Sequence, residues 1–216
     1  MTQDSEGPVR AAELAAHLAA RLCHDFISPA SAIVSGVDLL DDPAAQDMRE
    51  DALNLIATSA RKLADLLSFS RVAFGASASA ETFDVRELET LARGIFRHMR
   101  AELEWAVETP AVNKPAARAL LNLAHLAGAA LPTGGTARVR CVQEGASLAL
   151  AADAIGPKAR LRPEVLTGLQ GLPLTDGMHG QWVQAYYVSQ FIADAGGRVF
   201  ADANEERVVF AATLPA

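Results

Sequence analysis

One segment of the chain brings a histidine, a carboxylate and a proline close together. It reads RLCHDFISPASAIVSG, from Arg21 to Gly36, with His24, Asp25 and Pro29 at its centre. An exposed, neutral imidazole is a good nucleophile towards phosphorus, and a neighbouring carboxylate can orient the ring and raise its basicity. The segment therefore predicts phosphoryl transfer through His24, with Asp25 orienting the imidazole.

The helix that must position His24 is predicted from about residue 10 to residue 40. Its apolar residues recur at spacings of three, four or seven: Leu14, Leu18, Leu22, Phe26, Ile33, Val37 and Leu40. With Leu22 at the centre of the buried face, His24 points roughly 160° away, towards solvent. The same exposed strip carries His17, Ser31 and Ser35, with Ser28 at one side and Ile27 and Val34 at the opposite margin.

Pro29 follows His24 by little more than one helical turn. A proline inside a helix removes one backbone donor, here the one that would bond to Asp25, and it bends the helix. We therefore expect the helix to open locally just beyond the histidine, which would expose the imidazole further.

A second helix is predicted after the break DDPAAQ, from about residue 45 to residue 73. Its apolar stripe comprises Met48, Ala52, Leu55, Ile56, Ser59, Leu63, Leu66, Leu67 and Ser70. Two long helices joined by a short loop form an antiparallel hairpin, and one hairpin cannot cover both stripes. Two hairpins can, as a four-helix bundle, so the sequence predicts a homodimer.

The remaining chain has a different pattern, which divides the protein into residues 1–75 and residues 82–216. The segment GASASAE, from Gly75 to Glu81, is small and polar and is typical of a linker. Beyond it, strands are predicted at ETFDV, ELEWAV, TARVRCVQ, SLALAADA, GRVFADA and RVVFAATL, and helices at about 86–99, 114–131 and 181–195. Mixed helices and mainly antiparallel strands predict an α+β fold with a layered C-terminal domain.

Composition excludes several classes of protein. Of 216 residues, half are hydrophobic, and the net charge of −7 argues against binding to nucleic acid or to an anionic membrane surface. The first residues lack the apolar region of a signal peptide, and no run is long enough to span a bilayer. Cys23 and Cys141 are far apart in the sequence, so a reducing, cytoplasmic location is expected.

Other nucleophiles and ligands have weaker support. Cys23 precedes His24, but adjacent helical residues point about 100° apart and do not form a Cys–His pair. His17 shares the face of His24 without a following acid. His98, His125 and His179 show no paired metal-ligand spacing. We therefore expect no metal site in this chain.

The motif around His24 resembles the H-box of sensor histidine kinases, in which His and an acid are followed by three further residues and then Pro. In that family the histidine is phosphorylated on the first helix of a dimeric hairpin. The resemblance continues in LLNLAHLAGAALPTGGTARV, which is similar to the kinase N-box region, with matches at Asn122, Pro132, Gly134 and Gly135. The segment from Val183 to Pro215 resembles the last helix and two strands of the kinase ATP-binding domain.

The departures from the kinase pattern lie in the motifs that bind the nucleotide in kinases. Leu126 and Ala129 stand where kinases have the magnesium-binding asparagine and a basic residue. The G1-box is reduced to DAIGP, which begins at Asp153, and a glycine-rich segment is replaced by MHGQWVQ, where Trp182 is too bulky for close approach to phosphates. We expect no Mg-ATP binding, and we interpret Asp153 as a structural remnant.

A phosphoaccepting hairpin joined to a degenerate ATP-binding domain is similar to the ChpT-like histidine phosphotransferases of bacterial cell-cycle phosphorelays. This resemblance implies that the chain takes a phosphoryl group from the receiver domain of a CckA-like hybrid histidine kinase. It implies transfer onward to CtrA-like and CpdR-like response regulators, with magnesium supplied by the receiver and no cofactor in this chain.

Residues around His24 have expected roles in this relay. Arg21 and Lys62 are candidates to steady the phosphate charge, while Ile27, Ser28, Ser31 and Val34 are candidates for receiver docking. Two alternatives remain open. The chain could be an active kinase with divergent ATP boxes, or a non-catalytic dimeric adaptor that binds response regulators. The C-terminal domain is expected to have a structural or partner-contact role.

Overall fold

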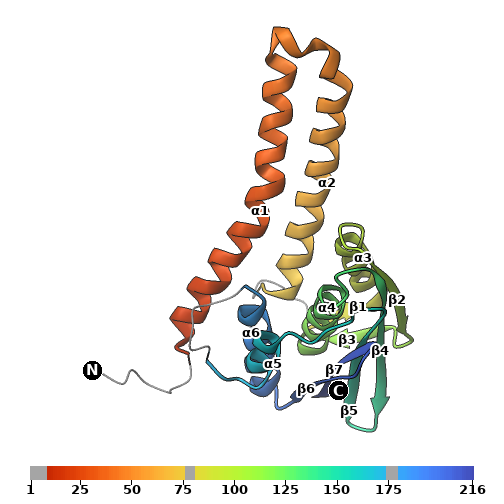
Figure 1. The fold of residues 1–216 in the computed structure, drawn as a ribbon. Helices are drawn as coiled ribbons and strands as arrows, with labels where there is room; N and C mark the ends of the chain where they lie inside the picture. The colour runs from red at the N-terminus through yellow and green to blue at the C-terminus, as the bar shows by residue number, and fades with distance from the viewer. Residues whose placement is uncertain (1–8, 76–80, 174–179) are drawn as a thin grey trace.

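Two long helices form a hairpin that stands on a layered C-terminal body (Figure 1). The computed structural model describes residues 9–75, 81–173 and 180–216. Helix α1 spans Ala11–Asp41 and α2 spans Arg49–Ala73, and the two run antiparallel, as predicted. None of the helices in these ranges is long and apolar enough to cross a membrane.

The second helix begins at Arg49, four residues later than predicted. Pro43–Met48 forms a 3₁₀ helix instead, and the carboxylate of Asp42 accepts a hydrogen bond of 2.8 Å from the backbone N–H of Ala44. Pro43 at the first position of this turn and an Asp cap before it favour a tight turn over a continuous helix. The turn reverses the chain between α1 and α2.

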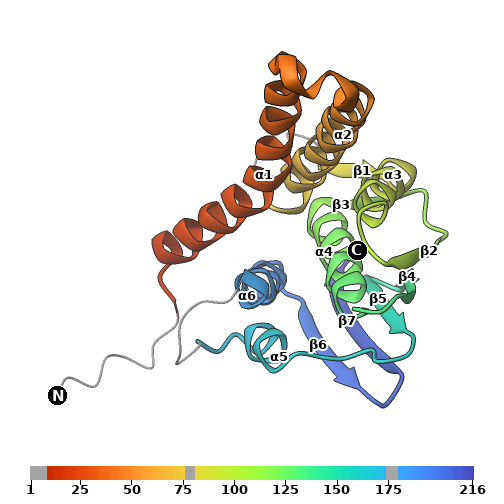
Figure 2. The same ribbon diagram turned by 45° about the horizontal axis from the view of Figure 1, so that its top comes forward.

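Helix α1 changes direction partway along its length, a bend that both ribbon views show (Figures 1 and 2). Pro29 lies within the helix and its ring is buried. Its missing N–H removes one backbone hydrogen bond, which is the usual cause of a sharp kink. The bend lets the N-terminal half of α1 follow the C-terminal body while the other half follows α2.

The C-terminal body is a five-stranded sheet covered by helices on one face. The strand order is β2-β4-β5-β7-β6, antiparallel except for the β2–β4 pair, and β1 and β3 form a separate two-stranded sheet. The strands are β1 Thr82–Asp84, β2 Ala101–Val107, β3 Ala111–Asn113, β4 Gly135–Glu144, β5 Ser147–Ile155, β6 Arg198–Ala203 and β7 Arg207–Pro215. The helices are α3 Val85–Phe96, α4 Lys114–Ala129, α5 Pro163–Leu169 and α6 Gly180–Asp194.

This arrangement confirms the predicted α+β class, the β4–β5 hairpin and each of the predicted strands and helices. The short elements α5 and β3 are additions. Strand β3 covers only Ala111–Asn113, and α5 covers only Pro163–Leu169. Neither is long enough to show a periodic pattern of apolar residues. Strand β3 is defined by its pairing with β1, and α5 packs against α6. The predicted linker lies mostly outside the described residues.

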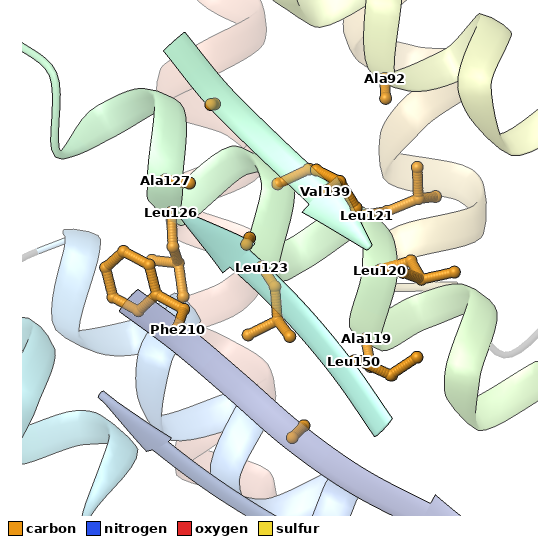
Figure 3. Close-up of a cluster of buried hydrophobic side chains, with 14 of the residues drawn as sticks. Ala92, Ala119, Leu120, Leu121, Leu123, Leu126, Ala127, Val139, Leu150 and Phe210 are labelled. Atoms are coloured by element: carbon orange, nitrogen blue, oxygen red, sulfur yellow. The ribbon is translucent and has the colours of Figure 1, made fainter. Parts of the chain in front are cut away.

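The main core lies between α4 and the inner face of the sheet (Figure 3). Helix α4 is almost entirely alanine and leucine on its buried side, and the side chains of Leu120, Leu123 and Ala127 are at most 1% exposed. Val139, Leu150 and Phe210 meet them from alternate positions of three strands. Small residues let the helix lie close to the sheet, which fixes α4 beneath the hairpin.

The hairpin is joined to this body at two places. The C-terminal end of α2 enters the main core through Phe69 and Ala73. The N-terminal half of α1 packs on α6, where Leu14 and Leu18 contact the buried Trp182 and Tyr186. The bulk of Trp182, which the sequence places where kinases need glycine, thus fills the contact between α6 and α1.

Much of the hairpin remains uncovered in the single chain. Val37, expected in the buried stripe of α1, is 43% exposed, and Leu67 of the α2 stripe is 49% exposed. One helix can cover only one side of its neighbour, so the wide apolar stripe of each helix is only partly buried within the hairpin.

The close approach of α1 and α2 at Gly36 gives a test of the packing. A Cβ atom at Gly36 would lie 2.6 Å from Ile56 Cγ1 and 3.1 Å from the carbonyl oxygen of Ala52. We expect Gly36→Val to lower the free energy of unfolding by about 2 kcal/mol, since overpacking outweighs the small gain in helix propensity. Urea denaturation at fixed protein concentration measures it.

Ser35→Ala is the matched control, because Ser35 is the exposed neighbour on the same helix. This change should leave stability unchanged or raise it by a few tenths of a kcal/mol. A Gly36→Val protein as stable as the wild type would contradict the close helix contact.

Candidate functional site

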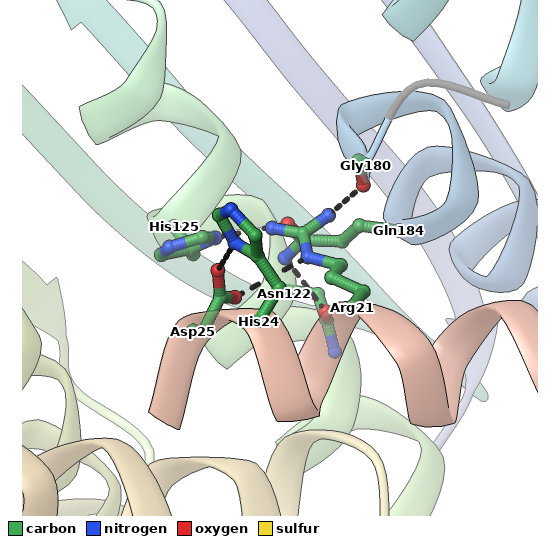
Figure 4. Close-up of polar contacts among 7 residues, drawn as sticks. All are labelled: Arg21, His24, Asp25, Asn122, His125, Gly180 and Gln184. Atoms are coloured by element: carbon green, nitrogen blue, oxygen red, sulfur yellow. Dashed lines mark hydrogen bonds and ion pairs between the residues drawn. The ribbon is translucent and has the colours of Figure 1, made fainter. Parts of the chain in front are cut away.

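His24 projects from α1 with its ring in solvent, as predicted. Its side chain is 87% exposed, and Nδ1 lies 3.3 Å from Oδ1 of Asp25 (Figure 4). When Nδ1 carries the proton, it donates to the carboxylate, and the lone pair of Nε2 is free to attack an electrophile. The geometry therefore supplies an exposed imidazole with one ring nitrogen within reach of a carboxylate.

Arg21 is placed differently from the expectation that it faces a phosphate. Its side chain is only 12% exposed, and Nε lies 3.6 Å from Oδ2 of Asp25. Its guanidinium also donates to the carbonyl oxygen of Gly180 at the start of α6. Burial lowers the pKa of Arg21, and the Asp25 carboxylate opposes that shift. The guanidinium is therefore committed to protein partners.

Two depressions flank His24. The α6-side depression, of about 530 Å³, is formed with His17, Ala20, Arg21, Asp25, Arg162, Glu164, Gly180, Gln181 and Val183. The α2-side depression, of about 300 Å³, is formed with Arg21, Asp25, Ser28, Lys62, Leu66, Ile95, His98, Met99 and His125. The histidine thus stands on a ridge between the C-terminal body and α2, with a cationic side chain on each side.

The four predicted docking residues and Lys62, the candidate to steady the phosphate charge, lie in three different places. Ser28 and Lys62 line the α2-side depression together with His24. Ser31 is exposed one turn further along α1. Ile27 and Val34 are 61% and 59% exposed but line neither depression. The structure therefore brings Ser28 and Lys62 to the histidine and leaves the two apolar side chains on another part of the helix surface.

A chain of side-chain hydrogen bonds runs behind the site (Figure 4). His125 Nδ1 donates to Oε1 of Gln184 over 2.9 Å, and Gln184 Nε2 donates to Oδ1 of Asn122 over 3.0 Å. Asn122 Nδ2 in turn donates to the carbonyl oxygen of Ala73 over 3.0 Å. Gln184 and Asn122 are buried. The chain joins α4, α6 and the last turn of α2.

The pKa of His125 is strongly lowered by its surroundings. Loss of hydration lowers its pKa to about 4, and the positive charge of Arg21 adds to this effect. The hydrogen bond to Gln184 and the Asp25 carboxylate oppose it. His125 is therefore neutral at physiological pH. Sequence reasoning did not identify this network, although Asn122 and His125 lie one turn apart in a matched motif.

A second contact joins α2 to the turn after α3. Asp65 accepts hydrogen bonds from Arg97 Nη2 at 2.9 Å and from His98 Nε2 at 2.9 Å. The carboxylate of Asp65 is 19% exposed, so it receives both donors in a partly desolvated position where such bonds are stronger. This contact closes the α2-side depression on the side away from α1.

The region that matches the kinase nucleotide boxes is arranged around packing and ion pairs. Leu126 is buried, and it lines a cavity of only about 10 Å³ together with Ala129, Ala130, Arg160, Leu161, Arg162, Val165, Gln181 and Phe210. The turn between α4 and β4 is present as predicted, with positive φ values of 97° at Gly134 and 131° at Gly135. A cavity of this size holds about one water molecule.

Asp153 faces away from that cavity. Its neighbours Ala152 and Ala154 are buried on the inner face of the sheet, so strand alternation turns Asp153 to the outer face. There it pairs with Arg140 Nη2 at 2.5 Å and Arg207 Nη2 at 2.6 Å. Among the described residues, no group of three or more His, Cys, Asp or Glu is placed to hold a metal ion.

Three comparisons place this geometry among known proteins. Residues 85–207 match the model of the histidine phosphotransferase C-terminal domain. The protein phosphotransferase ChpT of Brucella abortus (strain 2308) is 32% identical over 203 residues, which cover 94% of this chain and 96% of that protein. A solved bacterial phosphotransferase is 30% identical, with a TM-score of 0.85 over 96% of this chain and 98% of the other. The histidine kinase domain of Erythrobacter litoralis EL346 is more distant, 16% identical with a TM-score of 0.48 over 95% and 94% of the two chains.

The neutral state of His125 predicts a pH dependence of stability. The pKa is about 4 in the folded protein and about 6.5 in the unfolded chain. The unfolded state therefore binds a proton first as the pH falls, and the free energy of unfolding decreases between about pH 6.5 and pH 4. We expect His125→Gln to show a weaker decrease, measured by urea denaturation at pH 7.5 and pH 5. Equal losses in the two proteins would exclude His125 as the responsible group.

Proposed function

Because the chain belongs to the histidine phosphotransferase family, we propose that His24 carries its phosphoryl group between receiver domains. The observation that carries this proposal is the exposed imidazole of His24, with Nδ1 within hydrogen-bonding distance of Asp25 and Nε2 left open. Membership of the family identifies the chain as a phosphotransferase. The assignment of His24 as the phosphorylated residue and of receiver domains as its partners is proposed here.

The reaction is an in-line exchange of one phosphorus bond for another. Nε2 of His24 attacks the phosphorus of a receiver aspartyl phosphate, the P–N bond forms, and the P–O bond to the aspartate breaks. The aspartate leaves as a carboxylate, and the positive charge on the phosphorylated ring is balanced by Asp25 through Nδ1–H. Attack by a second receiver aspartate reverses these steps. Catalysis rests on positioning and charge neutralisation.

The receiver is proposed to bind over the ridge that carries His24. Lys62 on one side and Arg162 on the other line the two depressions beside the imidazole. Cations at these positions would balance charge on the transferring phosphoryl group. Ser28 and Ser31 supply a surface of small side chains on α1, where a partner can approach closely. Magnesium would come with the receiver.

The proposed donor is the receiver domain of a CckA-like hybrid histidine kinase, and the proposed acceptors are CtrA-like and CpdR-like response regulators. This assignment rests on the similarity to ChpT along 94% of the chain. Operation in a cell-cycle phosphorelay and a cytoplasmic location remain predictions from the same resemblance.

We further propose that the chain does not use ATP. The space beside Leu126 has a volume of about 10 Å³, far below the several hundred Å³ of an ordinary ligand site. Asp153 is paired with two arginines on the opposite face of the sheet. Trp182 is fully buried in the contact between α6 and α1. Each of these arrangements opposes nucleotide binding in the kinase manner.

The uncovered apolar side of the hairpin supports a homodimer. The two helices touch through Pro29 and Gly36 on α1 and through Ala52 and Ser59 on α2, all of which are buried. Other side chains can be located by their direction of rotation about the helix axis, counted from these contact positions. In an antiparallel pair, side chains reached by the same direction of rotation project from the same side of the hairpin. That side, the apolar hairpin face, comprises Ile27, Val34, Val37, Leu53 and Leu67, which are 43–61% exposed.

A second copy is the occupant that completes a four-helix bundle on this face. Five large apolar side chains gathered on one face of a hairpin are typical of a buried interface rather than of free surface. We therefore assign Ile27 and Val34 to the dimer interface instead of to receiver docking.

Replacing the histidine tests the transfer reaction. We expect wild-type protein to take labelled phosphate from a phosphorylated receiver of a CckA-like hybrid kinase as an acid-labile, alkali-stable label. His24→Ala should show no label, while His17→Ala, in the same depression, should retain it. Label on the His24→Ala protein would contradict the assignment, and unlabelled wild type with intact receiver binding would favour the adaptor alternative.

Charging the apolar hairpin face tests the dimer. We expect Leu67→Glu to convert the wild-type dimer to a monomer in analytical ultracentrifugation, because an interface cannot bury an unpaired carboxylate. Leu172→Glu is the matched control, since Leu172 is 51% exposed and Leu67 is 49% exposed. A monomeric wild type, or a Leu67→Glu protein that remains dimeric, would contradict the proposal that the apolar hairpin face is the dimer interface.

A further inference from the structure

Arg21 connects three groups that belong to different parts of the chain. From α1 it reaches Asp25 one turn ahead, through Nε, and the carbonyl oxygen of Gly180 at the start of α6. The two oxygens of Asp25 are thereby divided: Oδ2 lies 3.6 Å from Arg21 Nε, and Oδ1 lies 3.3 Å from His24 Nδ1. One carboxylate therefore stands between a buried guanidinium and an exposed imidazole (Figure 4).

We infer that Arg21 is a positioning residue through which the C-terminal domain sets the orientation of Asp25 and, through Asp25, the tautomer and orientation of His24. This inference rests on the proposed role of His24. It assigns to the C-terminal domain a task in phosphotransfer that requires no nucleotide.

The chemistry of the guanidinium suits this task. Its planar fork offers several donors in fixed directions, so one group can bond to a carboxylate and a carbonyl at once. An isolated ion pair between residues one helical turn apart orients little in water. Here the Arg21 side chain is only 12% exposed, and its second bond, to Gly180, holds the guanidinium against the first residue of α6. Asp25 consequently faces an anchored partner.

Helix α6, which begins at Gly180, is held in place by two independent sets of contacts. Next to Gly180 along α6, Trp182 and Tyr186 are packed against Leu14 and Leu18 of α1, and Tyr186 OH accepts a hydrogen bond of 3.1 Å from the backbone N–H of Val9. Deeper in the body, the hydrogen-bond chain through Gln184 and Asn122 ties α6 to the end of α2. A displacement of the C-terminal domain would therefore move the partner of Arg21.

A direct role of Arg21 on the phosphoryl group is the competing interpretation. The guanidinium would have to leave Asp25 and Gly180 to reach a phosphate on Nε2 of His24. Lys62 lies in the same α2-side depression as His24 and has no such commitments among the contacts of the described residues. The geometry favours Lys62 for charge neutralisation and Arg21 for orientation.

The test compares Arg21→Met and Arg21→Lys with Arg49→Met, which removes an exposed charge at the far end of the hairpin. Three quantities are measured on the full chain: the single-turnover rate of phosphoryl transfer from the phosphorylated receiver, the Kd for the unphosphorylated receiver, and the ¹⁵N shifts of the His24 ring. We expect Arg21→Met to slow transfer by about tenfold, the scale of a misoriented reacting group. The Kd should change less than twofold.

The ring shifts separate orientation from any general loss of activity. In wild type they should show mainly Nδ1–H, and in Arg21→Met the population should move towards Nε2–H. Arg21→Lys should recover part of the rate and of the shift, while Arg49→Met should match wild type. An Arg21→Met protein with unchanged ring shifts, or with a weakened Kd that accounts for the slower transfer, would overturn the inference.

A double-mutant cycle tests the route through the C-terminal domain. Trp182→Leu loosens the contact between α6 and α1 without touching Asp25. If Arg21 transmits the position of α6, the combined loss of rate in Trp182→Leu/Arg21→Met is smaller than the product of the single losses. Independent, multiplicative losses would contradict that route. Wild-type transfer through His24 in the same assay shows separately that the proposed function holds.

Discussion

The contact between α6 and the N-terminal half of α1 is the interaction on which the site depends. His24 stands on a helix that leaves its hairpin partner at a bend, so the direction of that half of α1 is not set by α2. It is set by Trp182 and Tyr186, which bury the apolar residues of α1. The position of both depressions depends on this contact, because the α6-side depression lies between α1 and the C-terminal body and the α2-side depression lies between α1, α2 and that body.

One of the residues that depart from the kinase pattern, Trp182, lies in this contact. Trp182 replaces a glycine-rich segment and becomes the largest fully buried side chain of the described residues. Leu126 projects from α4 into a small cavity. Asp153 is turned to the outer face of the sheet, where it pairs with two arginines of neighbouring strands. The α/β body thus holds the N-terminal half of α1 through α6. This interpretation gives a physical reason for keeping residues 82–216 in a phosphotransferase.

The sequence predicted the elements better than it predicted their contacts. A period near 3.6 over several turns located α1, and the angular position of His24 relative to Leu22 correctly gave its exposure. Alternation located the strands of the main sheet, because half-buried strands carry that pattern directly. Arg21 was named as a candidate to steady the phosphate charge, whereas its partner Gly180 is 159 residues away, a contact that no local pattern encodes. The Asn122–Gln184–His125 chain was missed for the same reason. Val37, predicted in a stripe that one hairpin cannot cover, is 43% exposed in the single chain.

The central claim is that the C-terminal domain positions His24 and does not phosphorylate it. The most direct measurement is the amount of acid-labile label on the full chain after incubation with labelled Mg-ATP alone, beside a parallel sample given a labelled phosphorylated receiver. The account predicts label from the receiver and none from ATP at any time of incubation. Label on His24 from ATP alone would contradict it and would identify the chain as a kinase with divergent nucleotide boxes.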